Sequence, residues 1–330
     1  MNPTSFDDPP DALDELPALA ASKGHLRSAI ADRLGADELA AVVQDDPALT
    51  LAVLRAANRA PNGWSTATVR DGVRALAATS LAEVAETLPT FDFFADRQQA
   101  ATSDLERFRV HALSVRRLAA TVARLGGRGD VEVAATAGLL HDVGKLAFAG
   151  QQRRGPSFGP ELTPEQRVLE ERERSGTDHA QVGGQLARRW RLPDVLMTAI
   201  ASHHDEHPTG VAAVVTVADL LAHFAAGARI DLYRLAAVGQ AAGLDRGQLG
   251  SLLYELPAPL TATPPEPCPL SARELEIVRA LRDGKVGKQI ARDLNLSEST
   301  VRSHLQRIYR RLGVADRAQA VLLASSKGWI

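Results

Sequence analysis

The sequence predicts an all-α protein. Apolar residues recur at helical spacing over residues 36–58, 104–125 and 178–190. No stretch shows the sustained alternation of β-branched residues that is typical of strands. Two sequences, Ser103-Asp-Leu-Glu106 and Ser271-Ala-Arg-Glu274, have the capping-box form, in which two side chains satisfy the free N–H groups at a helix N-terminus. We therefore expect the folded parts of the chain to be helical bundles.

Composition indicates an ordinary globular protein. The 330 residues are 45% hydrophobic and 24% charged, which suits about two domains of roughly 100–200 residues each. The longest apolar stretch, residues 211–226, contains Asp219 and His223 and is too short for a bilayer, so we expect no membrane segment. The single cysteine, Cys268, excludes intramolecular disulfides and Cys-ligated zinc fingers and fits a cytoplasmic protein.

Two proline-containing stretches set the expected domain boundaries. Residues 1–16 are acidic and lack a basic region followed by an apolar core, which predicts a disordered tail and neither a secretory signal nor a transit peptide. The sequence ELPAPLTATPPEPCPL carries six prolines and predicts a semi-rigid linker over residues 256–269. We therefore expect a large helical domain over residues 17–255 and a small one over residues 270–330.

Charge is distributed unequally between these parts. Residues 266–330 contain 12 Lys and Arg against 7 Asp and Glu, a net charge of +5, whereas the remaining 26 and 33 give residues 1–265 a net charge of −7. Such a split suggests a small nucleic-acid-binding module attached to an acidic domain. A basic surface helix without any ligand is the alternative explanation.

The C-terminal residues predict a helix-turn-helix. The sequences SARELEIVRALRDG, KQIARDLNL and SESTVRSHLQRIYRRLG are expected to form two short helices and a longer basic one, with Ser297 as the N-cap of the last. One stripe of this helix should face inward, namely Val301, Leu305, Ile308 and Leu312. The residues left facing outward are Thr300, Arg302, Ser303, Gln306, Arg307 and Arg310. Their donors suit base edges and phosphates, although any amphipathic helix has a polar outer face.

Residues 270–330 resemble the LuxR-type (GerE-like) DNA-binding domain. The matching text is LSARELEIVRAL, GKVGKQIARDLNLSESTVRSHLQRIYRRLGV and DRAQAV. The resemblance implies a small four-helix domain in which Arg302, Ser303 and Gln306 enter the major groove, while Lys288, Thr300 and Arg307 contact phosphates. Lysine often stands in the family where Ser303 or Gln306 stands here, so the DNA target should differ. The final helix, AQAVLLASSKG, usually dimerises in the family, which implies a homodimer on double-stranded DNA.

Histidines cluster upstream of the linker. Most of the nine histidines lie between His111 and His223, and the sequence GLLHDVGKL places His141 and Asp142 in an apolar context. Ordered along the chain, the polar set is His111, His141, Asp142, His179, His203, His204 and Asp219. Imidazole and carboxylate suit divalent ions such as Fe, Mn or Zn, and several helices could direct them at one centre. Taken singly, each histidine is better explained as a hydrogen-bonded core or surface residue; their joint occurrence favours a metal site.

This order of residues resembles the HD superfamily of metal-dependent phosphohydrolases, and its two-metal HD-GYP branch in particular. By that resemblance one metal is held by His111, His141, Asp142 and Asp219, and a second by His179, His203 and His204, with Asp142 bridging. Lys145 would contact a substrate phosphate as a catalytic residue, or else form an ion pair with Asp142 or an acidic neighbour. One or two ions of Fe, Mn, Zn or Mg are implied. After SHHDEH the chain continues as PTGVAAVV without a GYP loop, so cyclic di-GMP hydrolysis is not supported.

Residues 17–255 as a whole resemble an HDOD domain. The first half, residues 17–103, contains LGADELAAVVQDDPALTLAVLRAANRA, and the HD-like half, residues 104–255, contains FRVHALSVRRLA, TDHAQVGGQLARRWRLP and AIASHHD. Most members of this family are signalling or regulatory modules, and many lack the HD ligands that are retained here. The fusion implies a transcription regulator whose HDOD domain senses a ligand, metal or partner protein. A metal-dependent phosphohydrolase and a scaffold that only recruits proteins are the alternatives.

Overall fold

The computed structural model describes residues 16–59, 65–91, 100–146, 163–256, 268–282, 285–294, 296–314, 316–326 and 329. The chain divides into two compact units, Met1–Pro259 and Leu260–Ile330. The expected tail (1–16) and linker (256–269) lie outside the described residues except at their edges. The predicted all-α class is confirmed, with one small departure: Ala18–Leu19 (β1) pairs in parallel with Thr90–Phe91 (β2). Among the described residues no helix is long and apolar enough to cross a membrane.

The first part of the large unit is a bundle of short helices organised by Asp46. Its helices are α1 (Ala20–Ala31), α2 (Ala36–Val43), α3 (Pro47–Arg59), α4 (Val69–Ala75) and α5 (Ala78–Thr87). Asp46 precedes α3, and its Oδ1 accepts hydrogen bonds from the backbone N–H groups of Ala48 and Leu49 at 2.9 and 3.2 Å. Its Oδ2 accepts the N–H of Leu19 at 2.9 Å, so one buried carboxylate both caps α3 and holds β1.

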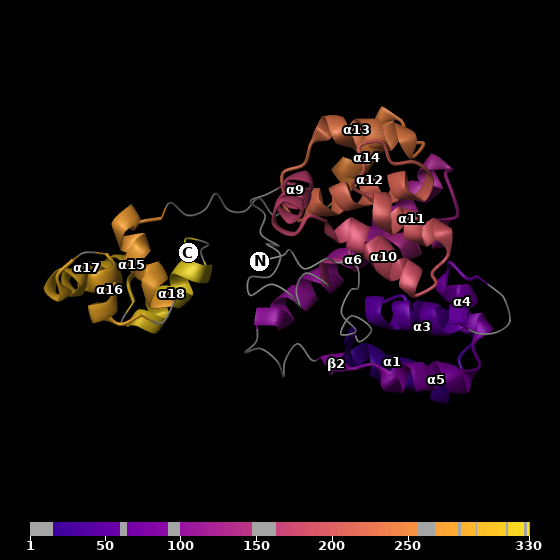
Figure 1. Cartoon of the computed structure of the whole chain (residues 1–330), viewed down its shortest axis with the longest axis horizontal. Coiled ribbons are helices and arrows are strands. Elements are labelled where there is room, and N and C mark those ends of the chain that lie inside the picture. The colour runs from indigo at the N-terminus through magenta and orange to yellow at the C-terminus, as the bar shows by residue number, and fades with distance from the viewer. Residues whose placement is uncertain are drawn as a thin grey trace. The chain divides into compact units, whose positions relative to one another are not determined.

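Helix α3 joins this bundle to the rest of the large unit because both of its faces are buried. Leu49 and Val53 belong to the core of the first bundle, whereas Leu51 and Leu54 pack into the next core together with Trp190. Figure 1 shows α1, α3, α4 and α5 gathered on one side of the large unit and α9 to α14 on the other. Helix α3 therefore contributes side chains to the apolar cores of both halves.

The HD-like half is built around a buried central helix. Its helices are α6 (Ala100–Gly126), α7 (Val131–Leu140), α9 (Pro164–Ser175), α10 (His179–Arg189), α11 (Asp194–Ser202), α12 (Gly210–Ala225), α13 (Leu232–Ala241) and α14 (Arg246–Glu255). Every residue of α12 from Ala212 to His223 is buried. A helix that is enclosed on all sides gives the polar side chains it carries fixed positions inside the domain.

One predicted helix start is wrong. The capping-box pattern at Ser103 predicts that a helix begins there, but α6 begins at Ala100, so Ser103 lies inside the helix. Ala100 and Ala101 precede Ser103, and because alanine is the strongest helix former it favours continuation of the helix past the capping pattern.

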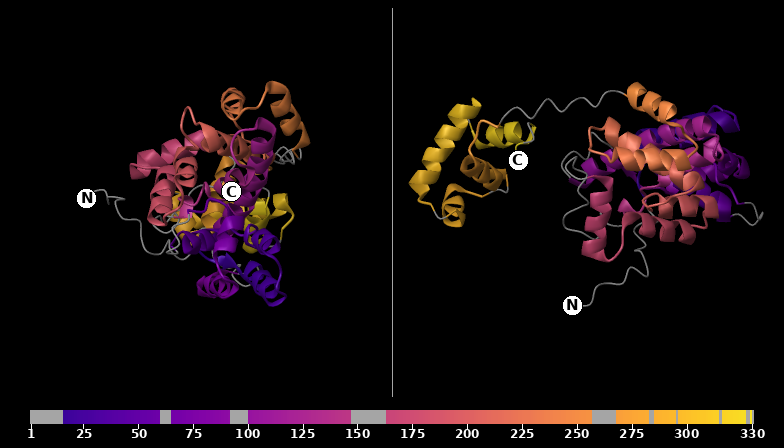
Figure 2. Two further views of the ribbon diagram at one scale, coloured as in Figure 1. Left: turned by 90° about the vertical axis from the view of Figure 1, so that its right-hand side faces the viewer. Right: turned by 90° about the horizontal axis from the view of Figure 1, so that it is seen from above.

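The small unit contains the expected helix-turn-helix. Its helices are α15 (Ala272–Arg282), α16 (Gly287–Asp293), α17 (Glu298–Leu312) and α18 (Arg317–Ser326), and Figure 2 shows them as one cluster coloured orange to yellow. Two predicted caps are confirmed: Ser271 and Glu274 exchange capping-box hydrogen bonds, and the Ser297 side chain accepts the N–H of Thr300. The inward stripe of α17 is also confirmed, since Val301 and Ile308 are buried and Leu305 and Leu312 pack against the same core.

Glycines allow close backbone approach on both sides of the His141-Asp142 pair. A Cβ on Gly138 would lie 2.9 Å from the Cβ of Ala119 and 3.0 Å from the carbonyl oxygen of Val115, so this glycine lets α7 approach α6. A Cβ on Gly144 would lie 1.9 Å from the carbonyl oxygen of His179. The turn that carries Asp142 therefore touches the N-terminus of α10 only because residue 144 has no side chain.

We predict that Gly144→Ala lowers the free energy of unfolding by about 1–3 kcal/mol, because the added methyl group forces the turn and α10 apart. Urea denaturation followed by circular dichroism measures this. Gly250→Ala on α14 is the matched control, since a Cβ there meets no atom within 4 Å. Alanine is also the better helix former, so this control should keep or gain stability by up to about 1 kcal/mol. Equal unfolding midpoints for the two variants would contradict the close approach.

Candidate metal centre and nucleic-acid interface

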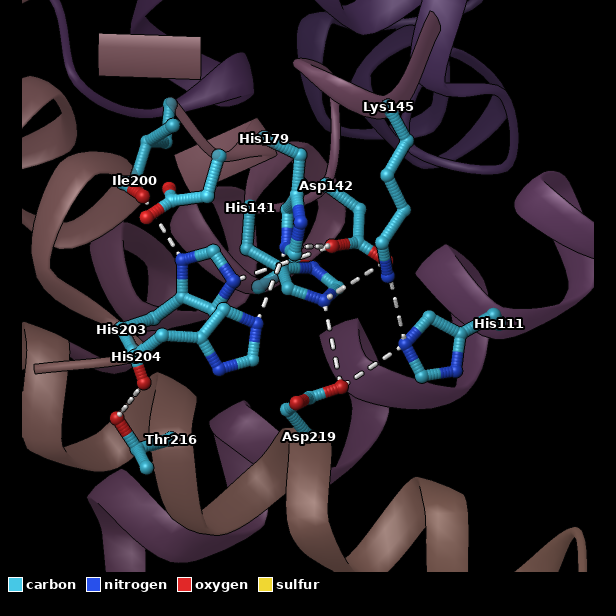
Figure 3. A network of polar contacts seen from close by, with 12 residues as sticks. His111, His141, Asp142, Lys145, His179, Ile200, His203, His204, Thr216 and Asp219 are labelled. Carbon is cyan, nitrogen blue, oxygen red and sulfur yellow. Dashed lines mark hydrogen bonds and ion pairs between the residues drawn. The ribbon is translucent and has the colours of Figure 1, made fainter. Parts of the chain in front are cut away.

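Five helices bring the sequence-predicted metal ligands into one buried cluster. His111 lies on α6, His179 begins α10 and Asp219 lies on α12. The other members follow the C-termini of α7 and α11, and they are His141, Asp142, His203 and His204. Figure 3 shows these seven side chains pointing toward one another. Residues up to 108 positions apart in sequence are thus in direct contact.

Asp142 lies at the middle of the cluster and contacts imidazoles with both oxygens. Its Oδ1 is 3.2 Å from His179 Nε2 and 3.9 Å from His203 Nε2. Its Oδ2 is 3.4 Å from His141 Nε2 and 3.6 Å from His111 Nε2. The carboxylate therefore has one oxygen on each side of the cluster, which is the arrangement that a bridging ligand needs.

Asp219 forms one end of the cluster. Its Oδ1 is 2.9 Å from His111 Nε2 and 3.5 Å from His141 Nε2. A third imidazole, that of His223, approaches the same oxygen with its Nε2 at 3.3 Å. At the other end His204 Nε2 lies 3.0 Å from His179 Nε2. Donor atoms thus extend in a row from His223 to His204.

Hydrogen bonds fix the tautomers of two of these histidines. His141 Nδ1 donates to the carbonyl oxygen of Gly138 and His203 Nδ1 to that of Ile200, both at 2.8 Å, because a carbonyl oxygen can only accept. Their Nε2 atoms consequently face the cluster, and both are buried without a hydrogen-bond partner. Asp142 Oδ1 is also buried without a hydrogen-bond partner. Buried polar atoms are normally satisfied, so three such atoms directed at one place fit a divalent ion.

Glu171 on α9 was not predicted from the sequence. Its Oε2 accepts a hydrogen bond from His179 Nδ1 at 2.6 Å and one from the His179 backbone N–H at 2.9 Å. This contact turns His179 Nε2 toward Asp142, as carboxylates commonly do for metal-binding histidines. His223 was also left out of the predicted set, although its spacing of four residues from Asp219 places both on one helix face.

Lys145 makes the ion pair that was the alternative to a phosphate contact. Its Nζ lies 2.5 Å from Asp142 Oδ2, and the residue is only 6% exposed. A lysine enclosed in this way places a positive charge directly beside the cluster. It also compensates the buried negative charge of Asp142.

Burial and charge shift the protonation of the cluster in opposite directions. Burial raises the pKa of Asp142, but the nearby side chains of His141, Lys145 and His179 outweigh it and hold the pKa well below 3.8. Burial lowers the pKa of His179, yet its contacts with the Asp142 and Glu171 carboxylates raise it to about 9. Burial and the neighbouring imidazoles lower the pKa of His203 to about 3. At neutral pH the cluster therefore contains carboxylates, neutral His203 and protonated His179.

The donor atoms form overlapping groups. Asp142, His179, His203 and His204 form one, His111, His141 and Asp142 a second, and His111, Asp219 and His223 a third, with the donor atoms of each lying within 4.8 Å of one another. Nitrogen donors predominate in all three. Such sets suit Fe, Mn or Zn better than Mg, which prefers oxygen ligands.

The predicted DNA-contacting residues lie on α16 and α17. Lys288 on α16 is exposed, as are Arg302, Ser303, Gln306 and Arg307 on α17. Thr300 is half-buried, and its Oγ1 lies 2.8 Å from the Oγ of the N-cap Ser297. Thr300, Arg302 and Ser303 lie in the first two turns of α17, near the helix end whose N–H groups and positive dipole favour phosphate.

The fold and these two sites define an HD-type helical domain joined to a helix-turn-helix domain. Comparison with known families matches residues 16–206, more than half of the chain, to the HDOD domain. Residues 268–324 match the bacterial regulatory proteins of the luxR family. The chain belongs to the HDOD domain family and carries a C-terminal LuxR-family domain, as the sequence predicts. Asp219 and His223 lie beyond the residues matched to HDOD.

Individual relatives match parts of the chain. The transcriptional regulatory protein DesR of Bacillus subtilis is 38% identical over 61 residues, 18% of this chain and 31% of that protein. Ribonuclease Y of Lactobacillus gasseri is 31% identical over 121 residues, 36% of this chain and 18% of that protein. The chain thus spans less than a third of either. The crystal structure of the MmoQ response regulator of Methylococcus capsulatus is similar over 73% of this chain and 98% of that one, with 25% identity and a TM-score of 0.57.

We predict that the metal-free protein is most stable near neutral pH, because the pKa of His179 is raised while those of His203, His204 and His223 are lowered. His203 is buried in the folded protein, where its pKa is about 3, so it stays neutral there as the pH decreases. In the unfolded chain the same histidine takes up a proton below about pH 6.5. The unfolded state is therefore favoured, and stability falls, as the pH decreases. His179 has a pKa of about 9 in the folded protein and keeps its proton above neutral pH, whereas the unfolded chain loses it. Stability therefore falls as the pH rises toward 9.

Urea midpoints between pH 5 and 9 in the presence of a chelator measure this dependence. His179→Gln should remove the alkaline decrease and leave the acid one. A wild-type midpoint that rises between pH 7 and 9 is the result that opposes the assignment of a protonated His179.

Proposed function

We propose that this protein is a cytoplasmic, DNA-binding transcriptional regulator whose HDOD domain is a metal-binding sensory module. The LuxR-family domain with its exposed polar helix face supports the DNA-binding part. The name of the relative DesR, a transcriptional regulatory protein, agrees with it. The buried cluster of imidazoles and carboxylates supports the sensory part.

In this proposal α17 lies in the major groove of double-stranded DNA. Arg302, Ser303 and Gln306 read base edges, because all three are exposed on that helix. Lys288, Thr300 and Arg307 hold phosphates and fix the position of the helix. Two copies of the chain bind neighbouring half-sites as a homodimer. This homodimer is a prediction from the family resemblance.

The observation that carries the metal-binding part is the set of buried atoms without hydrogen-bond partners, His141 Nε2, Asp142 Oδ1 and His203 Nε2. His111, His141, Asp142 and Asp219 would hold one ion, with His179, His203 and His204 holding a second next to the Asp142 carboxylate. A bound Fe, Mn or Zn ion would supply a Lewis acid that attracts an anionic ligand. His179 must lose its proton to bind, so metal uptake reports on both ion and proton concentration.

Metal-dependent phosphohydrolysis is the second candidate function. It is favoured by two adjacent donor groups that share Asp142 and by the Lys145 cation beside them, which could contact a substrate phosphate. The name of the relative Ribonuclease Y points the same way. Hydrolysis of bis-p-nitrophenyl phosphate with added Mn or Fe, absent in Asp142→Asn, would support an enzyme. No hydrolysis by metal-loaded wild-type protein would favour sensing alone.

The wild-type protein first selects its DNA target from a random pool. We predict that Arg302→Ala binds this DNA about 5- to 150-fold more weakly, as expected for a lost base contact of about 1–3 kcal/mol. Arg279→Ala on α15 is the matched control, because it removes an equal charge from an exposed position of the same unit outside α16 and α17. Gel-shift titration measures both. Equal losses of DNA affinity in the two variants would mean that binding depends only on the overall charge of the domain and not on a base contact by Arg302.

We predict that His141→Ala loses bound metal, because His141 is fully buried and its Nε2 faces the cluster. Metal analysis of purified wild-type protein and variant by mass spectrometry measures the content. His207→Ala is the matched control, since the His207 side chain is 89% exposed. Wild-type protein that retains no Fe, Mn or Zn, even after incubation with these ions, would rule out the centre.

A further inference from the structure

His223 is a buried histidine that the predicted ligand pattern does not use. It lies on α12 one turn after Asp219 and is 8% exposed. Its Nε2 is 3.3 Å from Asp219 Oδ1, and its ring centroid is 4.6 Å from that of His111. Residues four apart project from the same helix face, so α12 presents an imidazole and a carboxylate to one place.

The three donor atoms of His111, Asp219 and His223 lie within 4.8 Å of one another. Two imidazoles and one carboxylate are a common donor set for Fe, Mn and Zn, and they leave further positions open for a ligand. Each side chain comes from a long helix, α6 or α12, whose neighbouring residues are buried in the same core. The group is therefore held in place before any ion arrives.

Three imidazoles surround one oxygen of Asp219. His111, His141 and His223 direct their Nε2 atoms at Asp219 Oδ1, at 2.9, 3.5 and 3.3 Å. The His141 Nε2 has no proton to donate when its Nδ1 donates to the Gly138 carbonyl, so a hydrogen bond does not account for its position and a bound ion would. The His223 Nε2 faces the same oxygen, within reach of an ion held by His111 and Asp219.

We propose that His223 is a metal ligand that completes a binding position with His111 and Asp219. This inference rests on the proposed metal centre and adds to it a ligand on α12. The cluster then offers separate positions at its two ends for Fe, Mn or Zn.

Calorimetric titration of the metal-stripped full-length protein with Zn²⁺ tests the proposal. His223→Ala removes the imidazole, and His223→Gln keeps an N–H donor for Asp219 but is a poor metal ligand. His207→Ala is the control for loss of an exposed histidine. We expect both His223 variants to weaken binding at one position by at least about 10-fold and the control to match wild type. Circular dichroism spectra establish that each variant is folded.

The outcomes separate the two proposals. Wild-type affinity and stoichiometry in His223→Gln would overturn ligation and assign His223 the positioning of Asp219 by a hydrogen bond. Absorption spectra of the Co²⁺-loaded wild-type protein and His223→Gln provide a second readout, and ligation predicts a change in the ligand-field bands. Wild-type protein that binds no Zn²⁺ at all would overturn the metal centre itself. Full binding by wild type with unaffected variants would overturn only the role of His223.

Discussion

The buried carboxylate of Asp142 is the constraint on which the HD-like half depends. It is 1% exposed, and a charge removed from water must be compensated by its neighbours. Lys145 supplies one positive charge, and His179, whose pKa is raised to about 9, supplies another. Lys145 lies only three residues after Asp142, whereas His179 begins α10, so the second compensation requires α10 to pack against the turn that carries Asp142. The packing of α10 and the charge balance of the candidate site therefore depend on each other.

Much of this arrangement could be predicted from the sequence because it depends on the types and order of residues. Helical periodicity predicts the all-α fold class, and the order of histidines and aspartates along the chain predicts seven members of the cluster. The small unit was predicted in more detail, including the caps at Ser271 and Ser297, because its signals are local.

Features that depend on tertiary contact could not be predicted in this way. Glu171 resembles any other acidic residue of a polar helix, and only the position of α9 shows that it orients His179. The pairing of β1 with β2 joins residues about 70 positions apart and involves two residues in each strand, too few for a periodic signal. The pattern at Ser103 was misleading because the alanines before it extend α6. His223 was visible in the sequence, but its partner His111 lies on another helix.

The proposed regulator requires that the metal centre and the DNA-binding domain affect each other. If metal binding changes DNA affinity by some factor, DNA must change metal affinity by the same factor. The most direct measurement is the dissociation constant of the full-length protein for its selected DNA, with and without saturating metal. We expect a difference of at least about 5-fold that disappears in His141→Ala. Identical dissociation constants in the two states, with metal content verified, would contradict a sensory role for the HDOD domain.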